Sequence, residues 1–95
     1  MISFTVRMRF AQEDRADIAD ILQELTAASR LEPGCVTYIP HFVEGEPATV
    51  LIYEQYRDEA ALDHHRNSPH FAQYVTGGLL QLMKDRTREM LHAVA

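Results

Sequence analysis

The sequence has one cysteine, no tryptophan and few basic residues. Because Cys35 stands alone, an internal disulfide framework and a cysteine-ligated metal site are both excluded. Nine basic against fourteen acidic residues give a net charge of −5, which disfavours binding to nucleic acid or to an anionic membrane. No apolar run reaches the roughly 20 residues of a membrane span, and no signal-peptide stretch begins the chain. These absences predict a cytoplasmic protein that binds neither nucleic acid nor membrane.

Length and apolar content set the scale of the fold. With 95 residues, of which 46% are hydrophobic, the chain is expected to form a single folded domain over residues 1–95. A domain of this size has a poor ratio of volume to surface, and one that also builds a pocket gains stability by association. The size therefore favours a dimer.

The first strand and the first helix have the clearest patterns. Apolar and polar side chains alternate over residues 2–10, which indicates a strand with one apolar face. Apolar residues then follow helical spacing over residues 13–30, and Pro33 and Gly34 end this helix. Arg7 lies on the polar face of the strand and is a candidate for binding an anionic group of a substrate.

The segment Cys35–Val43 is apolar on both faces of a predicted strand. A strand of this kind is covered on both sides. Because a helix layer covers only one face of a sheet, we expect an identical subunit to cover the other face. Pro40 cannot donate a ladder hydrogen bond, so it indicates an edge strand or a bulge.

The remaining elements complete a β-α-β-β-α-β order. This order predicts an α+β, ferredoxin-like fold, an antiparallel four-stranded sheet with helices on one face. A glycine pair, Gly77-Gly78, is expected to end or kink the second helical region. The expected elements are a turn at Glu44–Pro47, a strand at Thr49–Tyr56, a helix at Glu59–Arg66, a helix beginning at Ser68-Pro69 and a strand at Arg86–Val94.

Three histidines lie in the segment Val50–Phe71, where a strand and two helix starts follow one another. Helical phase places His65 with the apolar residues, facing the sheet, and points His64 about 100° away. His70 lies in the first turn of the next helix, where the positive end of the helix dipole helps to keep its imidazole neutral. His65 and His70 are therefore candidates for a general acid/base pair.

Neighbouring aromatic and acidic residues complete the predicted pocket. We expect Tyr53 to act with the two histidines in catalysis, and Glu54, Tyr74 and Phe71 to bind the substrate together with Arg7. The alternative is that both histidines are buried and hydrogen-bonded, and serve only to tie the broken helix to the sheet.

A metal site is a further possibility at the same place. His64, His65 and His70 with Glu54 or Asp58 would supply ligand types that zinc or iron accepts. However, His64 and His65 diverge on their helix, and the proline at 69 interrupts the helix before His70. We therefore expect no protein-bound metal.

Several motifs occur in a distinctive order and spacing. They are Glu32-Pro33-Gly34-Cys35 with Tyr38, the run Tyr53–Leu62, His65, and Ser68-Pro69-His70-Phe71. In this order they resemble the antibiotic biosynthesis monooxygenase family, which includes quinol monooxygenases, and the resemblance covers nearly the whole chain. It implies a dimeric α+β barrel, in which two ferredoxin-like sheets pack face to face.

The resemblance also implies an activity. Monooxygenases of this family oxidise phenolic or quinol-type substrates with dioxygen and without metal or flavin. Such a reaction needs a dry, apolar pocket and a base that makes the substrate an electron-rich anion. His65 or His70 would be that base, and Tyr53 or Tyr74 would orient a ring hydroxyl. The absence of tryptophan argues against the haem degradation of some relatives.

Two other functions remain open. The same residues are equally similar to isomerases of phosphorylated autoinducers, in which a histidine moves a proton between carbons and an arginine such as Arg7 holds the phosphate. A non-catalytic, dimeric ligand-binding module is the third reading. The leading prediction is a cofactor-independent monooxygenase acting on a small molecule and dioxygen.

Overall fold

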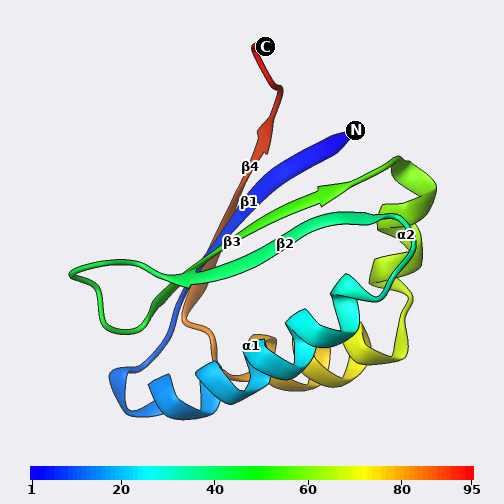
Figure 1. Ribbon diagram of the computed structural model, residues 1–95. Coiled ribbons are helices and arrows are strands. Elements are labelled where there is room, and N and C mark those ends of the chain that lie inside the picture. Colours follow the sequence, from blue (N-terminus) through cyan, green and yellow to red (C-terminus); the bar gives the residue numbers. More distant parts are fainter.

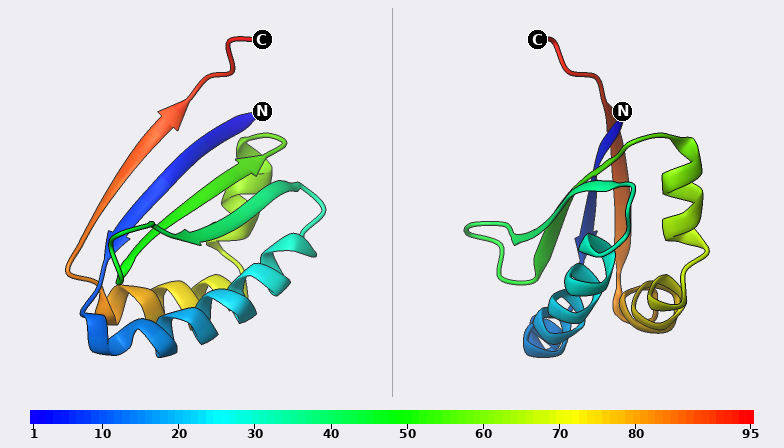
Figure 2. Two further views of the ribbon diagram at one scale, coloured as in Figure 1. Left: turned by 60° about the vertical axis from the view of Figure 1, so that its left-hand side comes forward. Right: turned by 45° about the vertical axis from the view of Figure 1, so that its right-hand side comes forward.

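A four-stranded antiparallel sheet and a layer of helices on one of its faces make up the computed structural model, which describes residues 1–95 (Figure 1). The order of strands and helices is the predicted one. Helices α1 and η2 run side by side under the sheet, while α2 stands at one end of them (Figure 2). The elements are β1 (Ile2–Arg9), η1 (Gln12–Asp14), α1 (Arg15–Arg30), β2 (Cys35–Phe42), β3 (Thr49–Tyr56), α2 (Glu59–Arg66), η2 (Phe71–Leu79), α3 (Leu80–Leu82) and β4 (Asp85–Leu91).

The sheet has the strand order β2-β3-β1-β4, and every neighbouring pair is antiparallel. This is the ferredoxin-like arrangement that the order of elements predicted. Strand β2 lies at an edge, where Pro40 needs no ladder partner for its missing N–H group. The prediction for this proline is confirmed.

The main core lies between the helix-facing side of the sheet and the helices α1 and η2. In the register of β1 and β3, Met8 lies opposite Val50 and Phe4 lies opposite Glu54, so these side chains share the helix-facing side. Ten buried residues form one cluster there: Met8, Phe10, Ile18, Leu22, Leu25, Tyr38, Val50, Ile52, Val75 and Leu79.

The second helical region differs from its prediction at the glycine pair. Rather than ending at Gly77 and Gly78, the chain runs through them as the π-helix η2 and continues into α3. A Cβ atom at Gly77 would lie only 3.1 Å from the carbonyl oxygen of Ala72. The missing side chain therefore lets the backbone close the wider π turn instead of breaking the helix.

The last strand is shorter than the predicted Arg86–Val94. Strand β4 begins at Asp85 and ends at Leu91. Its only neighbour is β1, and the pair Ser3 and Leu91 is the last in their register. Pairing with β1 ends there, one residue short of the first residue of β1, Ile2.

The second face of the sheet carries no helix (Figure 2). Polar side chains link three strands across it, because the Thr37 hydroxyl donates to Gln55 Oε1 at 2.6 Å and the Gln55 amide donates to Ser3 Oγ at 3.1 Å. Ile39 on the edge strand is 41% exposed. The dimer that would cover this face stays a prediction. None of the helices has the length and apolar character needed to cross a membrane.

Candidate active site

A cavity of about 520 Å³ lies between the helix-facing side of the sheet and the helices α2 and η2. Its volume is typical of small-molecule sites, and so is a mainly apolar wall with a few polar groups. The nine apolar lining residues are Phe4, Val6, Met8, Tyr38, Ile52, Leu62, Phe71, Val75 and Leu79. The five polar or charged ones are Glu54, His65, Arg66, Arg86 and Arg88.

Helix α2 presents His65 to this cavity. The Asp58 carboxylate caps the helix by accepting a hydrogen bond from the backbone N–H of Ala61 at 2.8 Å. His65 follows Ala61 by four residues and therefore lies on the same helix face. His65 is 2% exposed and His64 is exposed, which confirms the helical phase predicted for the two residues.

The turn between α1 and β2 packs directly against α2. A Cβ atom on Gly34 would overlap the Cβ atom of Ala61, so this approach requires a glycine. The backbone N–H of Arg57 also donates to the Gly34 carbonyl at 2.9 Å. The same turn places Glu32 beside His65, one helical turn beyond Ala61.

Glu32, His65 and His70 form a hydrogen-bonded triad. Oε2 of Glu32 lies 2.9 Å from Nδ1 of His65 and also contacts Nε2 of His70. A carboxylate oxygen accepts from both ring nitrogens, so the proton of His65 belongs on Nδ1 and the lone pair on Nε2. Oε1 of Glu32 is buried without a hydrogen-bond partner. The triad thus fixes the tautomer of His65.

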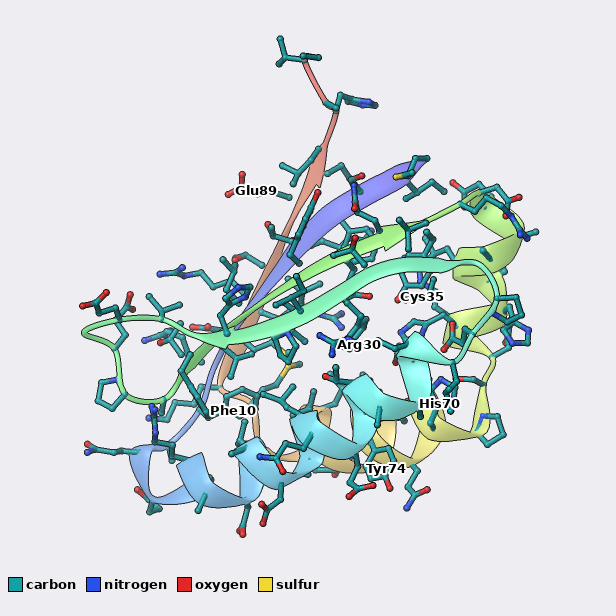
Figure 3. All side chains as sticks on the ribbon, viewed as in Figure 1. Phe10, Arg30, Cys35, His70, Tyr74 and Glu89 are labelled. Carbon is teal, nitrogen blue, oxygen red and sulfur yellow. The ribbon has the colours of Figure 1, made fainter.

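His70 is placed by the start of the next helix. The Ser68 hydroxyl donates to the His65 carbonyl at 2.7 Å and accepts from the backbone N–H of Phe71 at 3.2 Å. This is the capping role predicted for Ser68. His70 is half-buried at the junction of α1 with the α2–η2 connection (Figure 3). Its ring therefore contacts Glu32 from the side of the triad that faces solvent.

Aromatic rings surround the imidazole of His65. The ring centroids of Tyr56, Phe71 and Tyr38 lie 5.1, 5.3 and 5.7 Å from its own. Burial lowers the pKa of His65, although the hydrogen bond and charge of Glu32 act in the opposite direction. A neutral imidazole with Nε2 free is the form that accepts a proton.

Glu54 lies on the cavity wall opposite this imidazole. Its Oε1 accepts a hydrogen bond from the Tyr56 hydroxyl at 2.7 Å and lies 3.9 Å from Nε2 of His65. Burial raises the pKa of Glu54 to about 7, against the lowering effects of Tyr56, Arg66 and Arg88. Burial also raises the pKa of Tyr38 on the same wall. The cavity therefore holds Glu54, whose pKa is about 7, beside His65, whose neutral form is favoured by burial.

The structure brings together only some of the predicted site residues. His65, Glu54 and Phe71 line the cavity, and His70 joins His65 through Glu32. Tyr74 is half-buried and packs against the main core instead of lining the cavity (Figure 3).

Tyr53 and Arg7 lie on the other face of the sheet. Tyr53 precedes Glu54 in β3, and successive strand residues point to opposite faces. Arg7 pairs with the carboxylate of Glu46 at 3.0 Å on the open face. Neither side chain reaches the cavity of its own chain.

Four residues of the site were not predicted: Glu32 and the arginines Arg66, Arg86 and Arg88. One signal for Glu32 was available, because it follows α1 by two residues, where the negative end of the helix dipole disfavours an acid. An acidic residue at such a position therefore indicates a specific contact elsewhere in the fold. No sequence pattern marked the three arginines.

The triad also supplies ligand types that zinc or iron accepts. The ligand atoms of Glu32, His65 and His70 lie within 4.8 Å of one another. As placed, one oxygen of Glu32 is shared by two ring nitrogens, which is the geometry of hydrogen bonds. The absence of a metal stays a prediction, and elemental analysis of the purified protein showing stoichiometric zinc or iron would contradict it.

Comparisons with known proteins identify the family and three relatives. A family model described as antibiotic biosynthesis monooxygenase matches residues 1–77. Putative monooxygenase YcnE of Bacillus subtilis is 31% identical over 78 residues, which cover 82% of each chain. Putative monooxygenase Rv0793 of Mycobacterium tuberculosis is 32% identical over 63% of this chain, and an uncharacterized Synechocystis protein, sll1783, is 33% identical over 66%. The matches span only 58% and 43% of these last two proteins.

The same family appears among solved structures. A crystal structure of an antibiotic biosynthesis monooxygenase superposes over the full length of both chains with a TM-score of 0.92 at 25% identity. The family model covers most of the chain, and the strand order, the helix layer and the cavity are in place. The chain belongs to the antibiotic biosynthesis monooxygenase family.

Proposed function

We propose that this protein is a cofactor-independent monooxygenase that oxidises a small phenolic or quinol-type molecule with dioxygen. The observation that carries the proposal is the position of His65. Its Nδ1 is held by Glu32 at 2.9 Å, and its ring borders a mainly apolar cavity. Membership of a monooxygenase family supports the same reaction class.

His65 would act as the general base of this reaction. Its Nε2 would take the proton of a phenolic hydroxyl in the cavity, and Glu32 would stabilise the imidazolium that forms. His70 contacts the same carboxylate from the solvent side, so it would act as a positioning residue rather than touch the substrate. Glu54 would bind a second polar group of the substrate, and Phe71 would pack against its ring.

The phenolate formed in this way would supply the electrons for oxygen activation. Deprotonation raises the energy of the ring electrons, so that one of them can pass to dioxygen. In the overall reaction a ring carbon gains a carbonyl oxygen, the second oxygen atom leaves as water, and a phenol becomes a quinone. The apolar residues beside His65 support this chemistry because they limit the contact of water with the reactive anion.

Oxygen uptake with a panel of hydroquinones and polycyclic phenols tests the proposal. We expect uptake above the enzyme-free rate and no release of hydrogen peroxide. One dioxygen should be consumed for each quinone formed from a phenol, or for each hydroxyquinone formed from a hydroquinone. For His65→Ala we expect a loss of about 10²- to 10⁴-fold in rate, the usual contribution of a general base. His64→Ala is the matched control, because the neighbouring residue is exposed and lies outside the cavity.

Two results would contradict this proposal. Full turnover by His65→Ala would remove the base, and isomerisation of a phosphorylated dione without oxygen uptake would favour the isomerase alternative. Circular dichroism of the folded variant shows whether a lost rate reflects lost structure.

We also propose that two copies pack through the open faces of their sheets. The supporting observations are the helix-free face and the exposed Ile39 on it. On this proposal Tyr53 and Arg7 lie at or near the interface rather than in the cavity. Sedimentation at micromolar concentration should give a dimer, and a stable monomer would overturn the arrangement.

A further inference from the structure

Three arginines line the cavity, one from α2 and two from the last strand. Arg66 is the final residue of α2, and Arg86 and Arg88 are alternate residues of β4. In the register with β1, Arg86 lies opposite Met8 and Arg88 opposite Val6. Since Met8 and Val6 face the helices, the two β4 arginines point to the cavity side of the sheet. The next residue, Glu89, projects away from the helices (Figure 3).

These three arginines have no carboxylate partner in the structure. Elsewhere in the chain, Arg7 pairs with Glu46, Arg9 with Asp85 and Arg57 with Asp58. Two others donate to backbone carbonyls, Arg15 to Pro47 and Arg30 to Tyr38. The protein as a whole carries a net charge of −5. The unpaired guanidinium groups therefore gather at the cavity although acidic side chains are in excess.

Glu54 is the only acidic residue that lines the cavity, so a single carboxylate faces three cations there. Burial raises its pKa, and the charges of Arg66 and Arg88 act on it in the opposite direction. The guanidinium of Arg88 lies 5.5 Å from the ring centroid of Phe4, a lining residue. This contact holds the positive charge against the apolar wall, within reach of a bound ligand.

We propose that Arg66, Arg86 and Arg88 form an anion-binding subsite, so that the substrate is an aromatic compound with an acidic substituent. The ring occupies the apolar part of the cavity beside His65, and the substituent lies at the arginines. Planar guanidinium groups bind carboxylate and phosphate oxygens with paired hydrogen bonds. A cavity that concentrates positive charge also attracts anionic ligands from solution. The chemical step rests on the proposed function, whereas the binding does not.

Calorimetric titration of the purified protein separates binding from turnover. The probes are 1-naphthoate and its neutral analogue 1-naphthamide, which share a ring and carry no hydroxyl to oxidise. We expect naphthoate to bind at least about tenfold more tightly than naphthamide, because hydrogen bonds to a charged group are stronger than those to a neutral one. Its affinity should fall as sodium chloride rises from 50 to 500 mM, because salt screens charges at an open cavity.

Variants locate the subsite. Arg86→Gln and Arg88→Gln should each weaken naphthoate binding by about tenfold and leave naphthamide within about twofold. Lys84→Gln is the matched control, because it removes one charge just before β4 from a residue outside this cavity. Equal affinities of the wild-type protein for the two probes, or equal losses in all three variants, would overturn the proposal.

Two further arms identify the substituent and link it to the reaction. Comparing 1-naphthoate with 1-naphthyl phosphate under the same conditions distinguishes a carboxylate site from a phosphate site. At low concentration, oxygen uptake with 1,4-dihydroxy-2-naphthoate should exceed uptake with 1,4-dihydroxynaphthalene. Arg88→Gln should remove this difference by raising the KM for the carboxylated substrate. Selective naphthoate binding without oxygen uptake would refute the monooxygenase and leave the subsite standing.

Discussion

The two ends of the helical layer are packed in different ways. Under α1 and η2 lies the larger core, ten buried residues that form one continuous apolar cluster. Under α2 only four buried residues make a second cluster, Phe4, Tyr56, Ala61 and Leu62. The buried acids and the buried histidine, which are Glu32, Glu54 and His65, all belong to the α2 end. The α1 and η2 end therefore supplies most of the apolar core and also part of the cavity wall, whereas the α2 end contributes the buried ionisable groups.

This difference indicates that the α2 end contains buried groups that lower the stability of the fold. Burying an ionisable group is unfavourable unless it is paired, and an apolar residue of the same size is often as good for stability. Glu54 at the cavity wall and the unpartnered Oε1 of Glu32 are groups that packing alone would not retain. Four substitutions test the contrast, in order of decreasing expected effect.

Leu25→Ala should break the larger core. Leu25 is fully buried, and truncating a core leucine lowers the free energy of unfolding by about 2–5 kcal/mol. Urea unfolding measures this loss, while kcat/KM of the folded variant should stay within about twofold because Leu25 does not line the cavity. Leu31→Ala is the control, since Leu31 is 85% exposed. A large loss of activity without unfolding would show that the two ends are not separate.

Glu54→Gln should stabilise the protein at alkaline pH. The pKa of Glu54 is about 7 in the folded state against 4.5 for a free side chain, so between these values the unfolded chain loses its proton first. Stability therefore falls as pH rises through this window, by about 3 kcal/mol in all. Glutamine keeps the acceptor for Tyr56 without the charge.

Unfolding at pH 5 and pH 8 measures this effect. The gain from Glu54→Gln should be largest at pH 8 and small at pH 5. The same change at the exposed Glu89 should alter stability by less than about 0.5 kcal/mol at either pH. A gain that does not depend on pH would mean that ionisation is not its cause.

Gly34→Ala should separate the Glu32 turn from α2. The new methyl group would overlap Ala61, and overpacking of this kind lowers stability by about 1–3 kcal/mol. Activity should fall more than stability predicts, because the shift also moves Glu32 away from His65. Gly78→Ala is a suitable control, since its new methyl group would meet Ile21 at an ordinary 3.5 Å. Comparable effects of both changes would contradict the role given to Gly34.

His70→Gln should have the smallest effect. The charge of His70 lowers the pKa of His65 through the shared triad, so removing it should move that pKa upward. An NMR titration of the His65 ring and the acid limb of kcat/KM should both shift to higher pH, with little change in folding. His64→Gln, on the exposed face of α2, should leave both unchanged. A fall in rate without any pH shift would point to direct contact with substrate.

Much of the fold could be predicted from periodicity. Alternation over residues 2–10 and helical spacing over residues 13–30 are local consequences of burying one face, and both elements formed as expected. The same local rule placed His65 inward and His64 outward. Periodicity also implies that Tyr53 and Glu54 cannot face the same side of β3. Which of the two faces the cavity depended on which face of the sheet the helices cover.

The active-site environment was decided by tertiary structure. Glu32 is 33 residues from His65 and 38 from His70 in the sequence, and only the packing of Gly34 on Ala61 brings them together. The three arginines of the anion-binding subsite come from α2 and β4, two elements that border one cavity only in the folded protein. Periodicity thus predicted which side chains share a face of each element, because that spacing is local. The partners of those side chains depend on contacts between distant segments, and no local pattern records them.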